Sequence, residues 1–267
     1  MLVDEWRAHL AHRTLVVTGA GMSLASGIPT FRGSDPDAVW AHDVTELGTN
    51  EFFLDDPAAS WAWYLKRFGG LGHAVPNAGH HALAELERRH RARGGDLLVV
   101  TQNVDGLHRA AGSQALVEVH GRADRVRCSR RGCRFGAPAG SLARADVPID
   151  AFLAAPSEAT VPRCPQCGAL VRQHVLWFDE SYLDHADYEW PRVQRATEAV
   201  SLVVFVGTSF AVGVTDFVLQ TALDQGVPVY SIDPAGIEPD PRVRVIAAAS
   251  EHALPALVTA LDASPAP

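Results

Sequence analysis

The chain has 267 residues, of which 47% are hydrophobic and 20% are charged, and its formal net charge at neutral pH is −8. This length allows one large domain or two, and the composition predicts a globular core. The negative net charge argues against general binding to nucleic acid or to anionic membranes. No apolar run is long enough to span a bilayer, and the first residues lack the basic and apolar regions of a signal peptide. We therefore expect a cytoplasmic protein with no membrane partner and no specific nucleic-acid partner.

The first predicted elements lead into a glycine-rich turn. Residues 3–12 predict a short helix, and residues 14–18 are a β-branched apolar run typical of a buried strand. In the turn that follows, Gly19 and Gly21 let the backbone approach a phosphate, and the next helix would point free N–H groups at the anion. A G-x-G-x-x-G dinucleotide turn needs a third glycine, but Leu24 stands at that position. The local pattern alone therefore leaves an ordinary α/β turn open.

The residues after this turn carry a more specific signal. Gly27 and Pro29 should end the helix, and the loop that follows is expected to fold back near the glycines. The whole stretch, residues 19–33, resembles the sirtuins, which are NAD-dependent protein deacylases. Every constant position of their signature, GAG-x-S-x-x-SGIP-x-FRG, is present here. The resemblance implies NAD as a co-substrate, and the candidate NAD-binding residues of this stretch are Gly19, Ala20, Gly21, Ser23, Phe31 and Arg32.

Helices and strands alternate along most of the remaining chain. Asn50 is expected to cap a helix that continues to Phe68, and Asn77 is expected to cap one that stops at Gly94. Buried strands are expected at residues 96–101, 116–120, 202–206 and 227–232, with a weaker candidate at 242–247. This alternation predicts an α/β fold, a doubly wound parallel sheet of the Rossmann-like type with helices on both faces.

All four cysteines fall between residues 121 and 170, where arginines also become frequent. Cys164 and Cys167 have the C-x-x-C spacing of a zinc knuckle, and Cys128 and Cys133 form a wider pair. Disulfides are not expected in a reducing compartment, whereas two local thiolate pairs suit one tetrahedral structural zinc. The alternatives are four unrelated buried cysteines or a redox C-x-x-C, although a redox site would not need the first pair. We interpret the nearby arginines as a solvated face rather than as a nucleic-acid patch.

Two further motifs at strand ends are candidates for chemistry. Gln102, Asn103 and Asp105 follow a strand where ligands of open parallel sheets bind, and an amide beside a carboxylate suits the carboxamide of nicotinamide. An Asn-x-Asp-Gly sequence is otherwise only a turn, but the whole string is similar to the TQN-x-DGLH motif of sirtuins, whose Asn and Asp positions line the nicotinamide pocket. His120 lies at a strand end beside a glycine, where an imidazole can act as a general base. The similar His-Gly pair of sirtuins implies that His120 is catalytic, and we interpret His108 as structural.

Later strand ends complete the candidate cofactor site. The resemblance implies that Gly207, Thr208 and Ser209 hold the ribose and phosphates of NAD. Asp233 stands where sirtuins usually have Asn, and its carboxylate can instead accept hydrogen bonds from ribose hydroxyls.

Residues 171–180 resemble the R-P-H-V-V-W-F-G-E segment that pairs with the acyl-lysine peptide in sirtuins. The candidate substrate-binding residues of this segment are Val175, Trp177 and Phe178. The sequence departs from the usual pattern at Gln173, Leu176, Asp179 and, farther along, Val214. The carboxylate of Asp179 is expected either to favour basic peptides or to block one approach to the site.

Tyr64 and Arg67 share one face of their predicted helix because they are three residues apart. An ordinary amphipathic helix with an exposed arginine is the simpler interpretation. The pair is also similar to the Y-x-x-R pair of sirtuins that remove succinyl, malonyl and glutaryl groups, in which the two side chains bind a terminal carboxylate. We therefore expect a preference for succinyl-lysine, with acetyl-lysine as the alternative. Asp179 would oppose this preference if it faced the same pocket.

Together these features predict an NAD-binding domain of residues 1–121 and 171–267, interrupted by a zinc-binding module of residues 122–170. The implied reaction removes an acyl group from the lysine of a protein or peptide and consumes NAD. Its products are nicotinamide and O-acyl-ADP-ribose, and His120 removes a proton from a ribose hydroxyl. The alternative is an NAD hydrolase or ADP-ribosyltransferase that uses the same pocket. A different NAD-dependent oxidoreductase and a non-catalytic zinc-containing binding module also stay open.

Overall fold

The computed structural model describes residues 2–29 and 44–263. Within these ranges the helices are α1 (Leu2–His9), α2 (Val44–Leu47), α3 (Asn50–Asp55), α4 (Pro57–Phe68), α5 (Ala78–Ala92), α6 (Leu107–Ala110), α7 (Asp150–Ala154), α8 (Trp190–Glu198), α9 (Gly213–Asp224) and α10 (Ser250–Asp262). The strands are β1 (Arg13–Thr18), β2 (Asp96–Thr101), β3 (Leu116–Glu118), β4 (Gly121–Cys128), β5 (Leu142–Ala143), β6 (Val171–Val175), β7 (Leu202–Val206), β8 (Val229–Ile232) and β9 (Arg244–Ile246).

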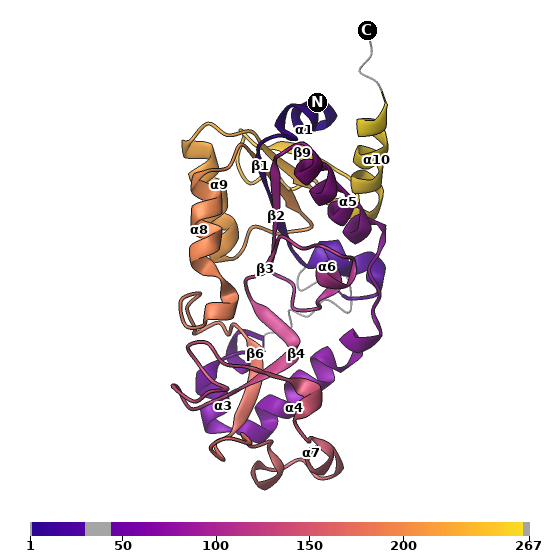
Figure 1. The fold of residues 1–267 in the computed structure, drawn as a ribbon. Helices are drawn as coiled ribbons and strands as arrows, with labels where there is room; N and C mark the ends of the chain where they lie inside the picture. Colours follow the sequence, from indigo (N-terminus) through magenta and orange to yellow (C-terminus); the bar gives the residue numbers. More distant parts are fainter. Residues whose placement is uncertain (1, 30–43, 264–267) are drawn as a thin grey trace.

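In the described part of the chain, six strands form one parallel sheet in the order β3-β2-β1-β7-β8-β9 (Figure 1). β1 pairs with both β2 and β7, so Thr18, Thr101 and Val206 lie side by side at the carboxyl ends. After β1 the chain adds β2 and then β3 on one side of it, and later adds β7, β8 and β9 on the other side. This order confirms the doubly wound fold, and it creates a switch point between β1 and β7, where such sheets bind ligands.

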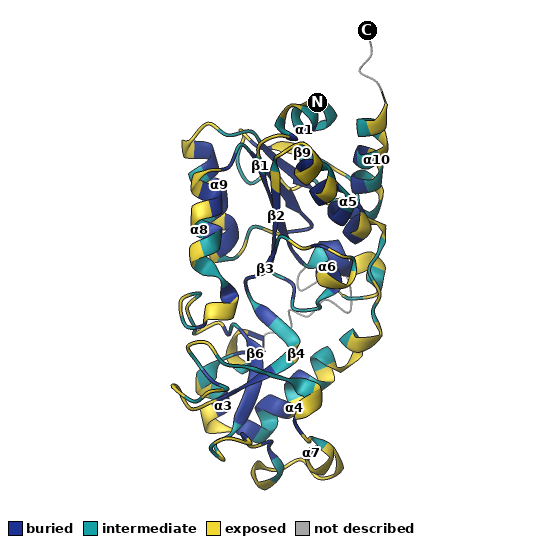
Figure 2. Ribbon diagram, in the orientation of Figure 1, coloured by how far each residue is buried: buried dark blue, intermediate teal, exposed yellow. Residues whose placement is uncertain are grey.

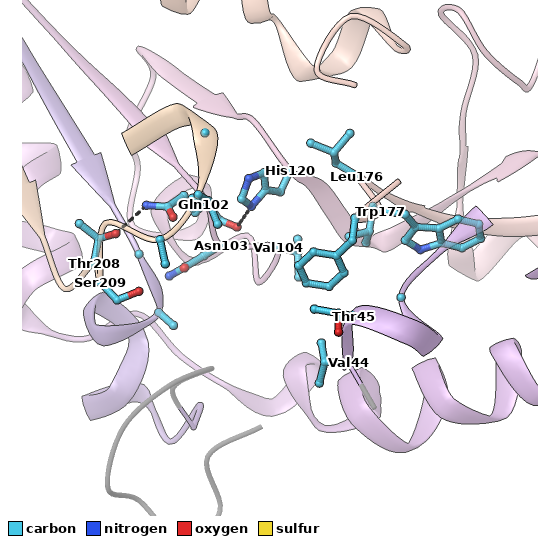
Figure 3. A pocket seen from close by; sticks show the side chains of 18 of the residues that line it. Val44, Thr45, Gln102, Asn103, Val104, His120, Leu176, Trp177, Thr208 and Ser209 are labelled. Atoms are coloured by element: carbon cyan, nitrogen blue, oxygen red, sulfur yellow. Dashed lines mark hydrogen bonds between the residues drawn. The ribbon is translucent and has the colours of Figure 1, made fainter. Parts of the chain in front are cut away.

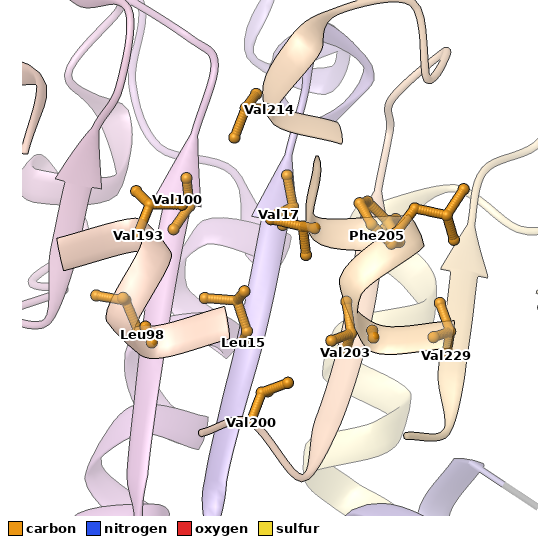
Figure 4. Close-up of a cluster of buried hydrophobic side chains, with 14 of the residues drawn as sticks. Leu15, Val17, Leu98, Val100, Val193, Val200, Val203, Phe205, Val214 and Val229 are labelled. Carbon is orange, nitrogen blue, oxygen red and sulfur yellow. The ribbon is translucent and has the colours of Figure 1, made fainter. Parts of the chain in front are cut away.

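Helices cover both faces of this sheet because its strands are apolar on both sides. Leu15 and Val17 of β1 pack into one core with α8 and α9 (Figure 4). Val16, which lies between them in the strand, packs into the opposite core with α1, α5 and α10. Successive side chains of a strand point to opposite faces, so one short apolar run contributes to both cores.

A smaller antiparallel sheet, in the order β5-β4-β6, lies beyond the carboxyl ends of the main sheet (Figure 1). Phe53 of α3, Trp61 of α4 and Phe152 of α7 share one buried core with Val126 and Val171 of this sheet. Figure 2 shows the strands of both sheets largely buried and α7 largely exposed. The cysteine-containing segment therefore packs against helices that precede β2 in the chain.

The helix expected from Asn50 onward is divided into α3 and α4. Thr49, rather than Asn50, caps α3, because its Oγ1 accepts a backbone N–H at 3.1 Å. Asp56 caps α4, and Pro57 occupies its first position. Proline is tolerated there because an N–H at that position would have no acceptor within the helix. Asn77 caps α5 as expected. None of the helices in the described ranges is long and apolar enough to cross a membrane.

Candidate functional site

A cavity of about 700 Å³ lies between the carboxyl ends of the main sheet and the smaller sheet (Figure 3). Its walls come from the loops after β1, β2 and β7, from the segment after β6, and from the end of α4. The volume lies within the range of about 300–1,000 Å³ that is typical of small-molecule sites. One half of the cavity is lined by polar groups and the other by aromatic side chains.

Three glycines bring the loops after β1 and β7 into contact at the polar half. A Cβ atom on Gly19 would lie 2.7 Å from the carbonyl oxygen of Gly207, and one on Gly21 would lie 2.8 Å from the Cα of Gly207. Gly207 has a φ of +59°, a left-handed conformation that favours glycine. The N–H groups of Gly19 and Gly21 donate to the carbonyls of Val206 and Gly207. Close loop packing therefore gives these glycines a structural role beside the expected approach to a phosphate. The turn continues as a 3-10 helix, Ala20–Ser26, rather than as an α-helix.

The Asn103 side chain lies in the polar half of the cavity. A chain of hydrogen bonds through two further predicted residues fixes its orientation. Its Nδ2 donates to the Oγ of Ser23 at 3.0 Å, and the Ser23 hydroxyl donates to the Oδ2 of Asp105 at 2.7 Å. Burial raises the pKa of Asp105. Among the described residues, Asn103 lines the cavity, whereas Ser23 and Asp105 do not. Ser23 and Asp105 therefore orient the Asn103 amide.

His120 lies two residues beyond β3, and its ring borders the cavity (Figure 3). The Nδ1 atom lies 2.9 Å from the carbonyl oxygen of Gln102. A carbonyl can only accept a hydrogen bond, so Nδ1 carries the proton and Nε2 keeps a lone pair. Burial lowers the pKa of His120 to about 4. The ring is therefore neutral at neutral pH, and its Nε2 can accept a proton.

Tyr182 is a cavity residue that the sequence motifs did not reveal. Its hydroxyl lies 3.3 Å from the Nε2 of His120 and accepts the backbone N–H of Val214 at 3.3 Å. Since Nε2 has no proton, the Tyr182 O–H donates to it. Val214 is one of the departures from the family pattern, and a proline there would have no N–H to offer. The departure at Val214 is the one signal in the sequence that could have led to this contact, and it was not interpreted that way.

The loops after β2, β7 and β8 supply further polar groups to the same half. Gln102 Nε2 donates to the Thr208 hydroxyl at 3.1 Å, which connects the β2 and β7 loops (Figure 3). Ser209 and Asp233 also line the cavity. Asp233 uses its Oδ1 to accept the N–H of Ala235 at 2.8 Å. These hydroxyls and the carboxylate suit the hydroxyl groups of a sugar.

The aromatic half contains most of the predicted substrate residues. It is lined by Trp63, Tyr64, Phe68, Val175, Trp177 and Phe178. The Tyr64 ring lies 5.5 Å from the Phe68 ring and 6.1 Å from the Trp177 ring, measured between centroids. Burial raises the pKa of Tyr64, so its hydroxyl stays protonated. Arg67 is half-buried one turn farther along α4 and is absent from the described lining.

Asp179 does not face this cavity. Its two carboxylate oxygens accept the N–H groups of Asn50 and Glu51 at 2.8 and 3.1 Å, at the start of α3. A negative charge is favourable at the N-terminus of a helix. This departure therefore has a structural role, and the expected repulsion of an acidic acyl group does not arise from it. Two other predicted residues, Phe31 and Arg32, lie outside the described part of the chain.

The four cysteine thiols converge at the far end of the smaller sheet. The Sγ atoms of Cys128 and Cys167 are 3.5 Å apart, and those of Cys133 and Cys164 are 3.8 Å apart. All four lie within 4.8 Å of one another. Zinc–sulfur bonds of about 2.3 Å in a tetrahedron separate the sulfur atoms by about 3.8 Å. The four residues thus fit one structural zinc.

Comparisons with known proteins give a consistent result. The family described as "Sir2 family" matches residues 19–214. A "NAD-dependent protein deacylase" of Thermus thermophilus is 41% identical over 242 residues, which cover 90% of this chain and 85% of the relative. A "NAD-dependent protein deacylase 2" of Pyrobaculum aerophilum is 38% identical over 247 residues, 91% of this chain and 89% of the relative. A Sir2 homologue in complex with NAD has a TM-score of 0.76 and 29% identity, covering 97% of this chain and 92% of that one. A mutant Sir2 homologue in complex with ADP-ribose has a TM-score of 0.80 and 29% identity, covering 97% and 95%.

Proposed function

The chain belongs to the Sir2 family and is an NAD-dependent protein-lysine deacylase, and from this premise we propose that it prefers lysines carrying a dicarboxylic acyl group such as succinyl or malonyl. One observation carries this proposal: Tyr64 lies in the cavity wall, and Arg67 follows it one turn later on α4. The acyl-lysine enters along Val175, Trp177 and Phe178.

The polar half of the cavity is the proposed site of NAD. The loops that carry Gly19–Gly21 and Gly207–Ser209 bind the phosphates and ribose, and the Asn103 amide binds the nicotinamide carboxamide. His120 accepts a proton from a ribose hydroxyl at its Nε2 atom. The proposed products are free lysine, nicotinamide and O-acyl-ADP-ribose. Mass spectrometry of the reaction tests this assignment, because free ADP-ribose without the O-acyl product would indicate NAD hydrolysis instead.

The charges around the aromatic half do not oppose an acidic acyl group. The Asp179 carboxylate is hydrogen-bonded to the N–H groups at the start of α3 and does not face the cavity. Glu180 lines the cavity, but its Oε1 lies 2.6 Å from the guanidinium groups of both Arg127 and Arg172, so its charge is compensated. Arg67 can form two parallel N–H bonds to a carboxylate, and the protonated Tyr64 hydroxyl can add a third.

Replacing Arg67 with methionine should reduce the preference for succinyl-lysine over acetyl-lysine by about tenfold or more. A hydrogen bond to a charged group contributes about 1.5–3 kcal/mol, and this contribution is lost only for the acidic acyl group. The measurement is kcat/KM on matched succinyl- and acetyl-lysine peptides. Lys66→Met is the matched control, because it removes a charge from an exposed position of the same helix. A wild type that prefers acetyl-lysine, or equal effects of the two variants, would contradict the acid-pocket assignment.

Replacing Tyr182 with phenylalanine should raise the pKa of His120. The hydroxyl donates to Nε2 and stabilises the neutral ring, and a net hydrogen bond of about 0.5–1.5 kcal/mol corresponds to roughly 0.4–1 pH unit. His120 works as a base only when neutral. As the pH is lowered, the variant should therefore lose activity at a higher pH than the wild type. An NMR titration of the His120 ring in the free protein measures the change. Tyr230→Phe serves as the control, because its hydroxyl bonds to Arg244 away from the cavity. An unchanged His120 titration would show that the 3.3 Å contact has no effect on the base.

A further inference from the structure

We infer that His174, His185 and Asp187 bind a zinc ion at a second site, separate from the four cysteines. One ligand atom from each of these residues lies within 4.8 Å of the other two. His174 is on β6, and the other two flank the start of the 3-10 turn Ala186–Tyr188. The strand and the turn are eleven residues apart in sequence, and only the fold brings the three side chains together. The inference is independent of the proposed acyl preference.

The spacing of the ligand atoms suits one small cation. The Oδ2 atom of Asp187 lies 3.1 Å from the Nε2 of His174 and 3.8 Å from the Nδ1 of His185. Zinc bonds to nitrogen and carboxylate oxygen are about 2.0–2.2 Å, which separates the ligand atoms of a tetrahedron by about 3.4 Å. Two imidazoles and one carboxylate, with a fourth position open, form a ligand set that zinc accepts.

His174 has an unmet bonding requirement that the ion would satisfy. Its side chain is 1% exposed, and neither ring nitrogen has a hydrogen-bond partner among the described residues. The carboxylate of Asp187 approaches Nε2 closely but without hydrogen-bond geometry. Buried polar atoms are almost always bonded. A cation between the imidazole and the carboxylate would bond both.

The surroundings orient the other two ligands as in known metal sites. The Nε2 of His185 lies 3.1 Å from the carbonyl oxygen of Gly140, so Nε2 carries the proton and Nδ1 keeps its lone pair. This lone pair accepts the backbone N–H of Asp187 at 3.1 Å, a contact that the ion would replace. The Ser141 hydroxyl donates to Asp187 Oδ2 at 3.1 Å and orients the carboxylate.

An ion could reach this site and keep its charge balanced. His174 and Asp187 line a polar cavity of about 590 Å³, which leaves the fourth position open to water. Arg122 acts electrostatically on Asp187, Arg127 acts on both histidines, and Arg172 acts on His185. Arg122 is paired with Asp124, and Arg127 and Arg172 share the carboxylate of Glu180, so the repulsion of a cation is reduced.

Titration with zinc tests the inference in the folded protein. The full chain is prepared with one zinc per chain, and calorimetry then follows further addition of zinc. The wild type should bind one further ion, giving two per chain. Asp187→Asn and His185→Gln should weaken this second binding at least tenfold while retaining the first zinc. Asp184→Asn, on the same loop, is the matched control and should bind two ions. Equal melting temperatures of the variants, each prepared with one zinc per chain, would show that the substitutions leave the fold intact.

Cobalt absorption separates the two sites by the atoms that bind the metal. Cobalt added after the cysteine site is filled should give bands without thiolate-to-metal charge transfer, and these bands should be lost in Asp187→Asn. The inference is overturned if the wild type saturates at one zinc per chain, or if Asp187→Asn and His185→Gln bind the second ion as the wild type does. Thiolate charge transfer from the added cobalt would likewise overturn it, since the metal would then be at the cysteines.

Discussion

Deacylation should fall by a factor of about 10²–10⁴ or more when His120 is replaced with alanine, while NAD still binds. His120 borders the cavity, and the Gln102 carbonyl holds its ring in the tautomer whose Nε2 is unprotonated. Alanine removes the proton acceptor but leaves Asn103, Thr208 and Ser209 in place. The loss should therefore appear in turnover rather than in NAD affinity.

Two measurements on the same protein test this expectation. Calorimetry gives the NAD affinity, and a peptide assay gives kcat. His81→Ala is the control, because His81 is an exposed histidine on α5, away from the cavity. The assignment of His120 as the base fails if its variant turns over at nearly the wild-type rate. Loss of NAD binding together with turnover would instead assign His120 a binding role.

Replacing Cys164 with serine should abolish zinc binding at the cysteine cluster and unfold the smaller sheet. Structural zinc contributes about 10–16 kcal/mol to the folding of small zinc modules. Cys128 and Cys164 belong to the same buried core as Val171 and Trp177. The Trp61 indole also donates to the Val171 carbonyl at 2.7 Å, connecting α4 to β6. Loss of the metal should therefore disturb the aromatic half of the cavity and reduce kcat/KM for the peptide.

Metal analysis and thermal unfolding measure these effects directly. The wild type should contain at least one zinc per chain, and the variant should lose one and melt at a lower temperature. Glu158→Gln changes an exposed side chain of the same region and should alter neither value. A variant with wild-type zinc content and stability would show that Cys164 is not a ligand.

Several features could be predicted from the sequence because their signals are local. Apolar runs placed β1, β2 and β7 within one residue of their observed bounds, and Asn77 was recognised as the cap of α5. The division between α3 and α4 was missed, because the Asp56–Pro57 stop lies inside a helix-like run. The last two strands, β8 and β9, are shorter than the apolar patterns suggested.

What the sequence determined by itself was the parallel sheet, the polar motifs that follow its strands, and the two pairs of cysteines. Each of these follows from residues that are close together in the chain, because strand patterns, turns and C-x-x-C spacing act over a few residues. Only the tertiary structure decided that Tyr182 contacts His120, that Asp179 accepts the first N–H groups of α3, and that His174 lies beside Asp187. These contacts join distant segments, so they depend on how the two sheets and their helices pack, and no local pattern encodes that packing.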